Sequence, residues 1–264
     1  MKRLISAAVL LPIVILIILK GDPVLLACLL ALFSAIGIAE FYRMALPERK
    51  AELWLAALIG PGLIFVPFTG SMALVIPAIG LLFVVFSFVF LFRIRTIETA
   101  AHEIAFALLA FLYIPFLLMH LLLLRQTLYG VQWLFVIMLI VMTNDTAAYY
   151  TGSAFGKRRL YLIVSPKKSI EGAIGGLFGS LGGTMLAKVT FFPQLTYGDA
   201  VVTAIIIGMV GQAGDLFESL LKRSFGVKDS GTLIPGHGGV LDRMDSILFA
   251  APITYYYVLF FFKG

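Results

Sequence analysis

Long apolar runs constrain this chain more than any other feature. A helix that crosses a bilayer needs about 20 mainly apolar residues, and such runs follow one another along almost the whole chain. Backbone polar groups inside a bilayer must be hydrogen-bonded internally, so helices are the expected spanning structures. The sequence predicts an all-α integral membrane protein with about nine transmembrane helices. We place them at 4–20, 23–45, 53–69, 72–92, 103–124, 131–151, 171–191, 199–222 and 244–262.

Composition agrees with this prediction. Only 13% of the 264 residues are charged and 61% are hydrophobic, whereas a soluble domain has about 25% charged residues. The net charge of +6 does not indicate nucleic acid, because the basic residues lie in short loops between the apolar runs. The single cysteine, Cys28, excludes an internal disulfide and makes a thiolate metal site unexpected.

The N-terminus resembles a signal peptide, with Lys2 and Arg3 followed by an apolar run. The run ends at Lys20, Gly21 and Asp22 without a small-residue cleavage pattern, so we interpret it as a retained first helix.

Loop charge predicts the orientation, because lysine and arginine gather on the cytoplasmic side of a membrane. With the N-terminus in the cytoplasm, 16 of the 20 basic residues fall on that side and the C-terminus lies outside. The other four are Lys20, Arg125, Lys188 and Lys263. We therefore expect a multi-pass protein of the cytoplasmic (inner) membrane whose active site faces the cytoplasm.

The chain divides by polar content. Residues 1–130 have few polar side chains within their helices, and we interpret them as a transmembrane scaffold region that also forms a homodimer interface. Glu40 and Arg43 are spaced for a local ion pair there. Residues 131–264 are the expected catalytic transmembrane region, with cytoplasmic loops at 152–170 and 223–243.

The least apolar stretch is 219–245, where glycines lie between lysines, arginines and aspartates. Glycine lets a backbone approach a ligand closely, basic side chains bind phosphate oxygens, and carboxylates are hard ligands for Mg²⁺. The stretch favours a metal-assisted phosphate site over an ordinary solvated loop.

Two further segments carry similar chemistry. Asp145 follows a long apolar run, where an ionisable group is costly and is a functional candidate, and Tyr149 lies one turn later. Ser165, Lys167 and Lys168 belong to a segment that we expect at a helix start, a place that suits an anionic phosphate.

Helical spacing shows which of the remaining polar and small residues share a helix face. Asp215, Glu218 and Lys222 share one helix face, and a solvated helix end fits Lys222 better than Asp215. Asp242 and Asp245 repeat the three-residue spacing. Small residues recur every four positions along 171–191, which predicts close helix packing. They are Gly175, Gly179, Gly183 and Ala187 in one stripe, and Gly172, Gly176, Ser180 and Thr184 in the other.

Taken together, these residues resemble the signature of the phosphatidate cytidylyltransferase (CDP-diacylglycerol synthase) family. The resemblance covers roughly 143–245. Its elements are Ser219, Lys222-Arg223, Lys228-Asp229, Gly231, Pro235, His237-Gly238-Gly239, Asp242-Arg243 and Asp245, with Asp145, Tyr149, Gly152, Phe155-Gly156-Lys157, Ser165-Pro166-Lys167-Lys168-Ser169 and Glu171-Gly172 as further motifs.

The resemblance implies that CTP and phosphatidic acid become CDP-diacylglycerol and pyrophosphate, with Mg²⁺ as cofactor and a second, monovalent cation. Its implied metal ligands are Asp145, Asp215, Asp242 and Asp245. The implied catalytic residues are Asp215, Asp245, Lys222, Arg223 and His237. The implied substrate-binding residues are Tyr149, Ser165, Lys167, Lys168, Lys228, Gly238, Gly239 and Arg243, without a division between CTP and lipid phosphate.

Two alternatives stay open. A membrane transporter or channel would explain deep carboxylates, but it predicts inverted repeats and polar groups near the membrane midplane. Another membrane phosphate-group transferase would share the basic and acidic groups, and strict dependence on CTP would separate it from a cytidylyltransferase.

Overall fold

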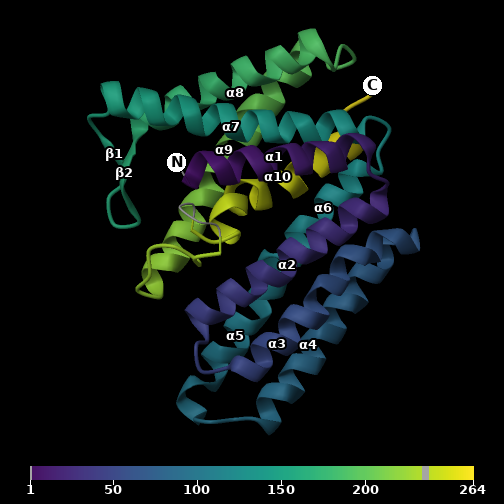
Figure 1. Ribbon diagram of the computed structural model, residues 1–264, viewed down its shortest axis with the longest axis vertical. Coiled ribbons are helices and arrows are strands. Elements are labelled where there is room, and N and C mark those ends of the chain that lie inside the picture. The colour runs from purple at the N-terminus through teal and green to yellow at the C-terminus, as the bar shows by residue number, and fades with distance from the viewer. Residues whose placement is uncertain (1, 234–237) are drawn as a thin grey trace. The chain divides into compact units, whose positions relative to one another are not determined.

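The computed structural model describes residues 2–233 and 238–264, and helices account for 79% of what it describes. The predominantly helical fold predicted from the apolar runs is therefore confirmed (Figure 1). The elements are α1 (Lys2–Lys20), α2 (Pro23–Ala45), α3 (Lys50–Ile59), η1 (Gly60–Thr69), η2 (Met72–Leu74), α4 (Val75–Phe92), α5 (Ile97–Tyr113), α6 (Pro115–Arg125), α7 (Gly130–Phe155), β1 (Arg159–Tyr161), β2 (Ser165–Ser169), α8 (Ile170–Thr190), α9 (Tyr197–Ser224) and α10 (Leu241–Phe260).

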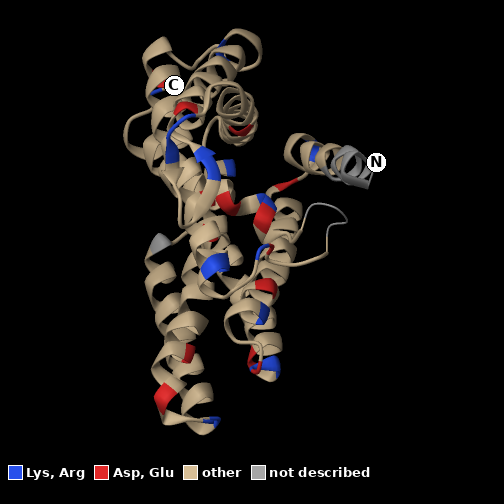
Figure 2. Cartoon of the chain, turned by 90° about the vertical axis from the view of Figure 1, so that its left-hand side faces the viewer, with Lys and Arg blue, Asp and Glu red and all other residues tan. Residues whose placement is uncertain are grey.

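Six helical segments in the described part of the chain are long and apolar enough to cross a membrane. They are Pro23–Ala45, Lys50–Thr69, Val75–Phe92, Ile97–Arg125, Gly130–Phe155 and Tyr197–Ser224. Figure 2 shows long stretches of helix without a charged residue. The predicted runs at 4–20, 171–191 and 244–262 form α1, α8 and α10, which are helical but not among the six.

Prolines determine where the predicted runs change their geometry. The run predicted at 103–124 is split, because α5 ends at Tyr113 and α6 begins at Pro115. Ile114 keeps a helical conformation and donates its N–H to the Ala110 carbonyl at 3.1 Å, so the break reflects the hydrogen bond that Pro115, which has no backbone N–H, does not make. In the run predicted at 53–69, the 3₁₀-helix η1 replaces the α-helix from Gly60 and contains Pro61 and Pro67. A tight turn follows at Gly70, whose φ is +70°.

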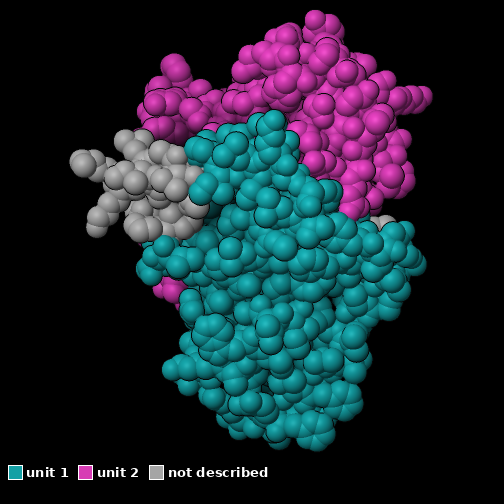
Figure 3. All heavy atoms as spheres, turned by 45° about the vertical axis from the view of Figure 1, so that its right-hand side comes forward, with its two compact units in different colours: residues 1–123, 229–243 teal, residues 124–228, 244–264 magenta. Residues whose placement is uncertain are grey.

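The chain folds into two compact units, coloured separately in Figure 3. Unit 1 contains residues 1–123 and 229–243. Unit 2 contains residues 124–228 and 244–264. Each unit therefore combines segments that are far apart in the sequence.

Unit 1 is built around α2, which packs against α3, η1 and α5, while α4 packs against α5 and η1 (Figure 1). Its apolar core includes an edge-to-face ring pair between Phe86 and Phe111, with centroids 4.6 Å apart. A β-carbon at Gly60 would lie 2.7 Å from Ile38 Cδ1 and 2.8 Å from Phe111 Cε1. Glycine at this position therefore permits the close approach of η1 to α2 and α5.

A buried ionic network lies within unit 1. The Arg49 side chain is 2% exposed and pairs with Glu103 and Glu52, and its guanidinium also donates to the Arg93 carbonyl at 2.6 Å. Arg93 Nε lies 3.0 Å from Glu52 Oε1. The sequence assigned both arginines to membrane orientation only. Their pairing also ties the start of α3 to the loop before α5.

Unit 2 has its closest helix packing between α7 and α8. A β-carbon at Gly175 would collide with Thr151, and one at Gly176 would lie 2.7 Å from Asn144 Oδ1. A β-carbon at Gly179 would lie 2.5 Å from Ala147 Cβ. The prediction that the small residues of α8 serve close packing is confirmed.

A short antiparallel hairpin, β1–β2, precedes α8, with Arg159 opposite Ser169 and Tyr161 opposite Ser165. The segment 165–168, expected at a helix start, is therefore extended. The helix begins only at Ile170, because Ser169 is the N-cap and its Oγ accepts from the Gly172 N–H at 3.1 Å. This corrects the expected setting of Ser165, Lys167 and Lys168.

Candidate active site

A cleft of about 620 Å³ lies in unit 2 between α7, the β1–β2 hairpin, the start of α8, and α9. Its polar lining combines carboxylates, cations and amides. These residues include Asn144, Asp145, Tyr149, Lys167, Lys168, Gln212 and Asp215. Five of the predicted site residues, Asp145, Tyr149, Lys167, Lys168 and Asp215, thus come together around one cavity.

An ion pair crosses this cleft. Lys168 on β2 contacts Asp215 on α9, and both side chains are about one-third exposed. Ser219, one turn further along α9, donates its hydroxyl to the other oxygen of Asp215 at 3.4 Å. The strand conformation of β2 brings the Lys168 ammonium to α9, 47 residues later in the chain. A positive and a negative side chain therefore meet within one cleft.

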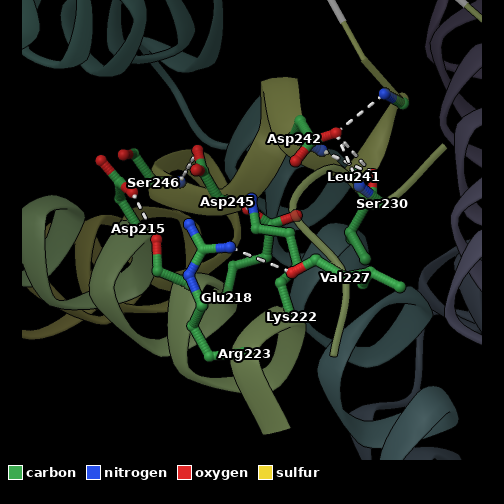
Figure 4. A network of polar contacts seen from close by, with 12 residues as sticks. Asp215, Glu218, Lys222, Arg223, Val227, Ser230, Leu241, Asp242, Asp245 and Ser246 are labelled. Atoms are coloured by element: carbon green, nitrogen blue, oxygen red, sulfur yellow. Dashed lines mark hydrogen bonds and ion pairs between the residues drawn. The ribbon is translucent and has the colours of Figure 1, made fainter. Parts of the chain in front are cut away.

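Asp245 approaches the same carboxylates from α10. A β-carbon at Gly214 would lie only 2.5 Å from the Asp245 carbonyl oxygen, so glycine permits the two helix backbones to meet. The carboxylate of Asp245 lies within electrostatic range of Asp215, Glu218 and Asp145, and it accepts from the Ser246 N–H at 2.7 Å. Figure 4 shows Asp215, Glu218, Asp245 and Ser246 in this region.

These carboxylates are chemically suited to a hard divalent cation. Carboxylate oxygen is the preferred protein ligand of Mg²⁺, and several carboxylates in mutual repulsion gain from a cation between them. Within 2–233 and 238–264, no three His, Cys, Asp or Glu side chains are close enough together to form a complete metal-binding group. The carboxylates therefore match Mg²⁺ in donor type, without forming a preassembled ligand group within these residues.

Lys222, a predicted catalytic residue, does not lie at a solvated helix end. It is 9% exposed and its ammonium pairs with Glu218 Oε2 at 2.7 Å, one turn away on α9. Glu218 itself is fully buried. A buried lysine is stabilised by such a partner, which the i, i+4 spacing supplies. Arg223 is instead exposed, and its guanidinium donates to the Val227 carbonyl at 3.1 Å.

A buried amide network lies beside the cleft. The Asn144 side chain is 3% exposed, donates to Ser180 Oγ at 2.8 Å, and accepts from Gln212 Nε2 at 3.0 Å. Gln212 Nε2 also donates to the Ala173 carbonyl at 3.0 Å. The network joins α7, α8 and α9 immediately next to Asp145 and three residues before Asp215. It therefore helps to fix the positions of these two carboxylates.

Glu171 holds the end of α7 to the start of α8. Its carboxylate accepts from the backbone N–H groups of Lys157 and Arg158, at 3.1 and 3.2 Å, and from Arg158 Nε at 3.1 Å. The loop that borders the cleft is thus fastened to the start of α8 by the Glu171 carboxylate.

In unit 1, Asp242 organises the glycine-rich loop. Its Oδ2 accepts from the Ser230 N–H at 2.9 Å, the Ser230 hydroxyl at 2.9 Å, and the Gly239 N–H at 2.8 Å (Figure 4). Gly238 has a φ of +83°, which favours glycine. The Gly239 N–H, expected to serve a phosphate, is therefore already used within the loop.

The remaining predicted residues occupy varied settings. Tyr149 is exposed on α7, Lys167 is exposed on β2, and Ser165 is half-buried at the start of that strand. Lys228 and Arg243 are exposed, in unit 2 and unit 1 respectively. His237 and Pro235 lie outside the described residues.

Sequence reasoning missed three contributors. Asn144 and Gln212 stood beside predicted carboxylates but were not singled out, although an amide within an apolar run was the available signal. Glu40 was interpreted as the partner of Arg43. Its carboxylate is directed instead to the loop of unit 1, where it accepts from the Val240 and Leu241 N–H groups.

Apolar helices together with a cleft of lysines and carboxylates are typical of membrane enzymes that act on phosphate esters with a divalent cation. Comparison with known proteins identifies a family within this class. The model of the cytidylyltransferase family matches residues 1–261, so the chain belongs to that family.

Several relatives named phosphatidate cytidylyltransferase are similar to this chain. The Staphylococcus epidermidis protein is 34% identical over 257 residues, which covers 95% of this chain and 96% of the relative. The Staphylococcus aureus protein is 36% identical over 259 residues, with the same shares. The match to the Bacillus subtilis protein is 36% identical over 160 residues and spans 60% of each chain.

Proposed function

We propose that this chain is a phosphatidate cytidylyltransferase that converts CTP and phosphatidic acid into CDP-diacylglycerol and pyrophosphate. The observation that carries the proposal is the cleft of unit 2, where Lys167 and Lys168 share one cavity with Asp145 and Asp215. Family membership and the names of the relatives support the choice of substrates.

The reaction requires alignment more than proton transfer. A phosphate oxygen of phosphatidic acid, already an anion, attacks the α-phosphorus of CTP. The bond from this phosphorus to the oxygen that bridges it to the β-phosphate breaks, and pyrophosphate leaves with the electron pair. The protein must hold two mutually repelling anions in line, which is the main contribution of enzymes to phosphoryl chemistry.

The basic residues have distinct places in this proposal. Lys167 and Lys168 on β2 bind phosphate oxygens in the cleft. When substrate binds, Lys168 leaves Asp215 and contacts a substrate phosphate instead. Arg223, Lys228 and Arg243 supply exposed positive charge near the ends of α9 and α10. Lys222 stabilises the buried Glu218 carboxylate and thereby maintains the polar face of α9.

Asp215 and Asp245, with Asp145, would hold Mg²⁺, and Asp242 remains a predicted ligand whose Oδ2 also orders the loop. The metal, when bound, neutralises charge on the triphosphate and on the leaving pyrophosphate. A second, monovalent cation would bind at the same carboxylates. The hydrogen bond between Asn144 and Gln212 would hold α7 and α9, which carry Asp145 and Asp215, at a fixed separation.

The membrane arrangement is also proposed. Nine helices cross the cytoplasmic membrane, with the N-terminus and the cleft facing the cytoplasm and the C-terminus outside. Residues 131–264 carry the catalysis, and 1–130 serve as a scaffold through which two copies form a homodimer. A monomeric mass for the protein in mild detergent would contradict the dimer.

The test is to incubate the purified protein in detergent with CTP, phosphatidic acid and Mg²⁺ and to measure a lipid-soluble cytidine product. We expect product that disappears with EDTA and that is not formed when ATP replaces CTP. Well-folded protein that forms no product with CTP or dCTP would contradict the proposal. Product from any nucleoside triphosphate would favour a broader phosphate-group transferase.

A further inference from the structure

We propose that Glu40 is a positioning residue that fixes the glycine-rich loop for the transfer reaction. Glu40 lies in α2 and is 1% exposed. It accepts hydrogen bonds from the Val240 N–H at 3.0 Å and the Leu241 N–H at 2.9 Å, and its Oε2 lies 3.3 Å from the Ser230 hydroxyl oxygen. The catalytic part of this inference rests on the proposed function, whereas the contacts themselves do not.

The contact occurs at a helix N-terminus. Leu241 begins α10, where backbone N–H groups have no acceptor within the helix. A carboxylate at this end also interacts favourably with the helix dipole. Glu40 Oε1 accepts a hydrogen bond from the Val240 N–H, and Oε2 accepts one from the Leu241 N–H. Glu40 thus caps α10 from another helix, 201 residues away in the sequence.

The glycines of the loop are adapted to this carboxylate. A β-carbon at Gly231 would lie 2.7 Å from Glu40 Oε1, and one at Gly239 would lie 2.5 Å from Glu40 Oε2. Both distances are too short for a real side chain, so only glycine lets the loop close around Glu40. Two glycines of the signature are therefore explained by the fold.

Ser230 links Glu40 on α2 to Asp242, the carboxylate that organises the loop. Its hydroxyl lies between Glu40 Oε2 and Asp242 Oδ2, and Asp242 also accepts from the Gly239 N–H. Residues 229–233 and 238–243, which we call the loop anchor, are thereby held to α2. The anchor sets the first turn of α10, the helix that contains Asp245 three residues after Asp242.

The substitution Glu40→Gln tests the proposal sharply. Each carboxylate oxygen faces a backbone N–H, so whichever position the amide nitrogen of glutamine takes, it opposes a donor. Turning the amide over does not relieve this. We expect faster amide hydrogen exchange in the loop anchor. We also expect kcat to fall by about 10- to 100-fold, the effect of a small misplacement, with KM for CTP unchanged because the cleft of unit 2 is intact.

Glu52→Gln is the matched control. Glu52 is also a buried carboxylate of unit 1, but it pairs with Arg49 and Arg93 at 3.5 and 3.0 Å. We expect a lower unfolding temperature with unchanged exchange in the loop anchor and unchanged kcat. If Glu40→Gln does not fold, Ser230→Ala removes the joining hydroxyl, and the same changes in exchange and kcat are expected on a smaller scale.

Unchanged exchange in the loop anchor of Glu40→Gln would overturn the proposal, as would faster exchange with unchanged kcat. Exchange and activity are measured on the same preparations, which separates this inference from the proposed function. A wild-type protein without cytidylyltransferase activity would remove the catalytic role, while the exchange data would still decide whether Glu40 orders the loop.

Discussion

At the scale of single residues, the site depends on charges that are only partly neutralised within the protein. Asp215 has one lysine partner, and Asp245 lies near three other carboxylates. Such an arrangement is costly for folding and is therefore expected where a ligand completes it.

Replacement of Asp215 or Asp245 by asparagine removes negative charge from the proposed metal site without changing the size of the side chain. We expect turnover to fall by at least about 100-fold, because a bound metal supplies several kcal/mol of transition-state stabilisation. The measurement is product formation at saturating Mg²⁺. Glu48→Gln, on an exposed side chain, serves as the control, and near-normal activity of either variant would exclude that aspartate from the site.

Lys168→Met tests the cation that contacts Asp215, and methionine preserves most of the side-chain length. A charge-assisted hydrogen bond to phosphate contributes roughly 1.5–3 kcal/mol, so kcat/KM for CTP should fall by about 10- to 100-fold. Lys263→Met, at the exposed C-terminus, should be neutral. Equal kinetics for the two variants would place the phosphate-binding function elsewhere.

At the scale of elements, the pairing of α7 with α8 determines the geometry of the cleft. Both helices contribute lining residues, and the glycines of α8 set the distance between the helix axes. Sequence periodicity predicted that α8 packs closely through its small residues, and the structure identifies α7 as the partner. The strand β2, which carries both cleft lysines, was not predicted, because its extended form depends on pairing with β1.

Gly179→Ala and Gly182→Ala make a matched pair on α8. A β-carbon at Gly179 would collide with α7, and overpacking of this kind costs about 1–3 kcal/mol. A β-carbon at Gly182 would meet no atom within 4 Å, and alanine gains up to about 1 kcal/mol in helix propensity. We expect the thermal unfolding midpoint, monitored by circular dichroism, to be lowered by Gly179→Ala and not by Gly182→Ala. The reverse order would contradict the packing role.

At the scale of the whole molecule, the two units combine distant segments, since unit 1 includes 229–243 with the start of α10, and unit 2 includes all of α9 and the remainder of α10. The units are defined by packing, so the division into a scaffold region and a catalytic region at residue 130 stays a prediction. Residues 229–243 pack with the first half of the chain.

The proposed orientation predicts where introduced cysteines react. In a Cys28→Ser background, Lys263→Cys should be labelled by a membrane-impermeant maleimide in intact cells. Lys50→Cys should be labelled only after the membrane is permeabilised, because the charge bias places it in the cytoplasm. Labelling of the two positions in the opposite pattern would reverse the proposed topology.

The sequence by itself determined the features that depend on near neighbours in the chain. Apolar runs of sufficient length predicted the helices, and four-residue spacing of small side chains predicted that 171–191 packs closely against another helix. The ordered signature at 219–245 indicated the family. Each of these signals is contained in one continuous stretch, so no knowledge of the fold was needed to interpret it.

The tertiary structure decided which distant groups meet. It directed Glu40 to the glycine-rich loop and buried Lys222 against Glu218, and it brought Lys168 to Asp215. Glycines that had been interpreted as places for a ligand were found to make room for Glu40 and Asp242. Such contacts depend on which faces of separate elements pack together, and helical periodicity fixes a face without naming its partner.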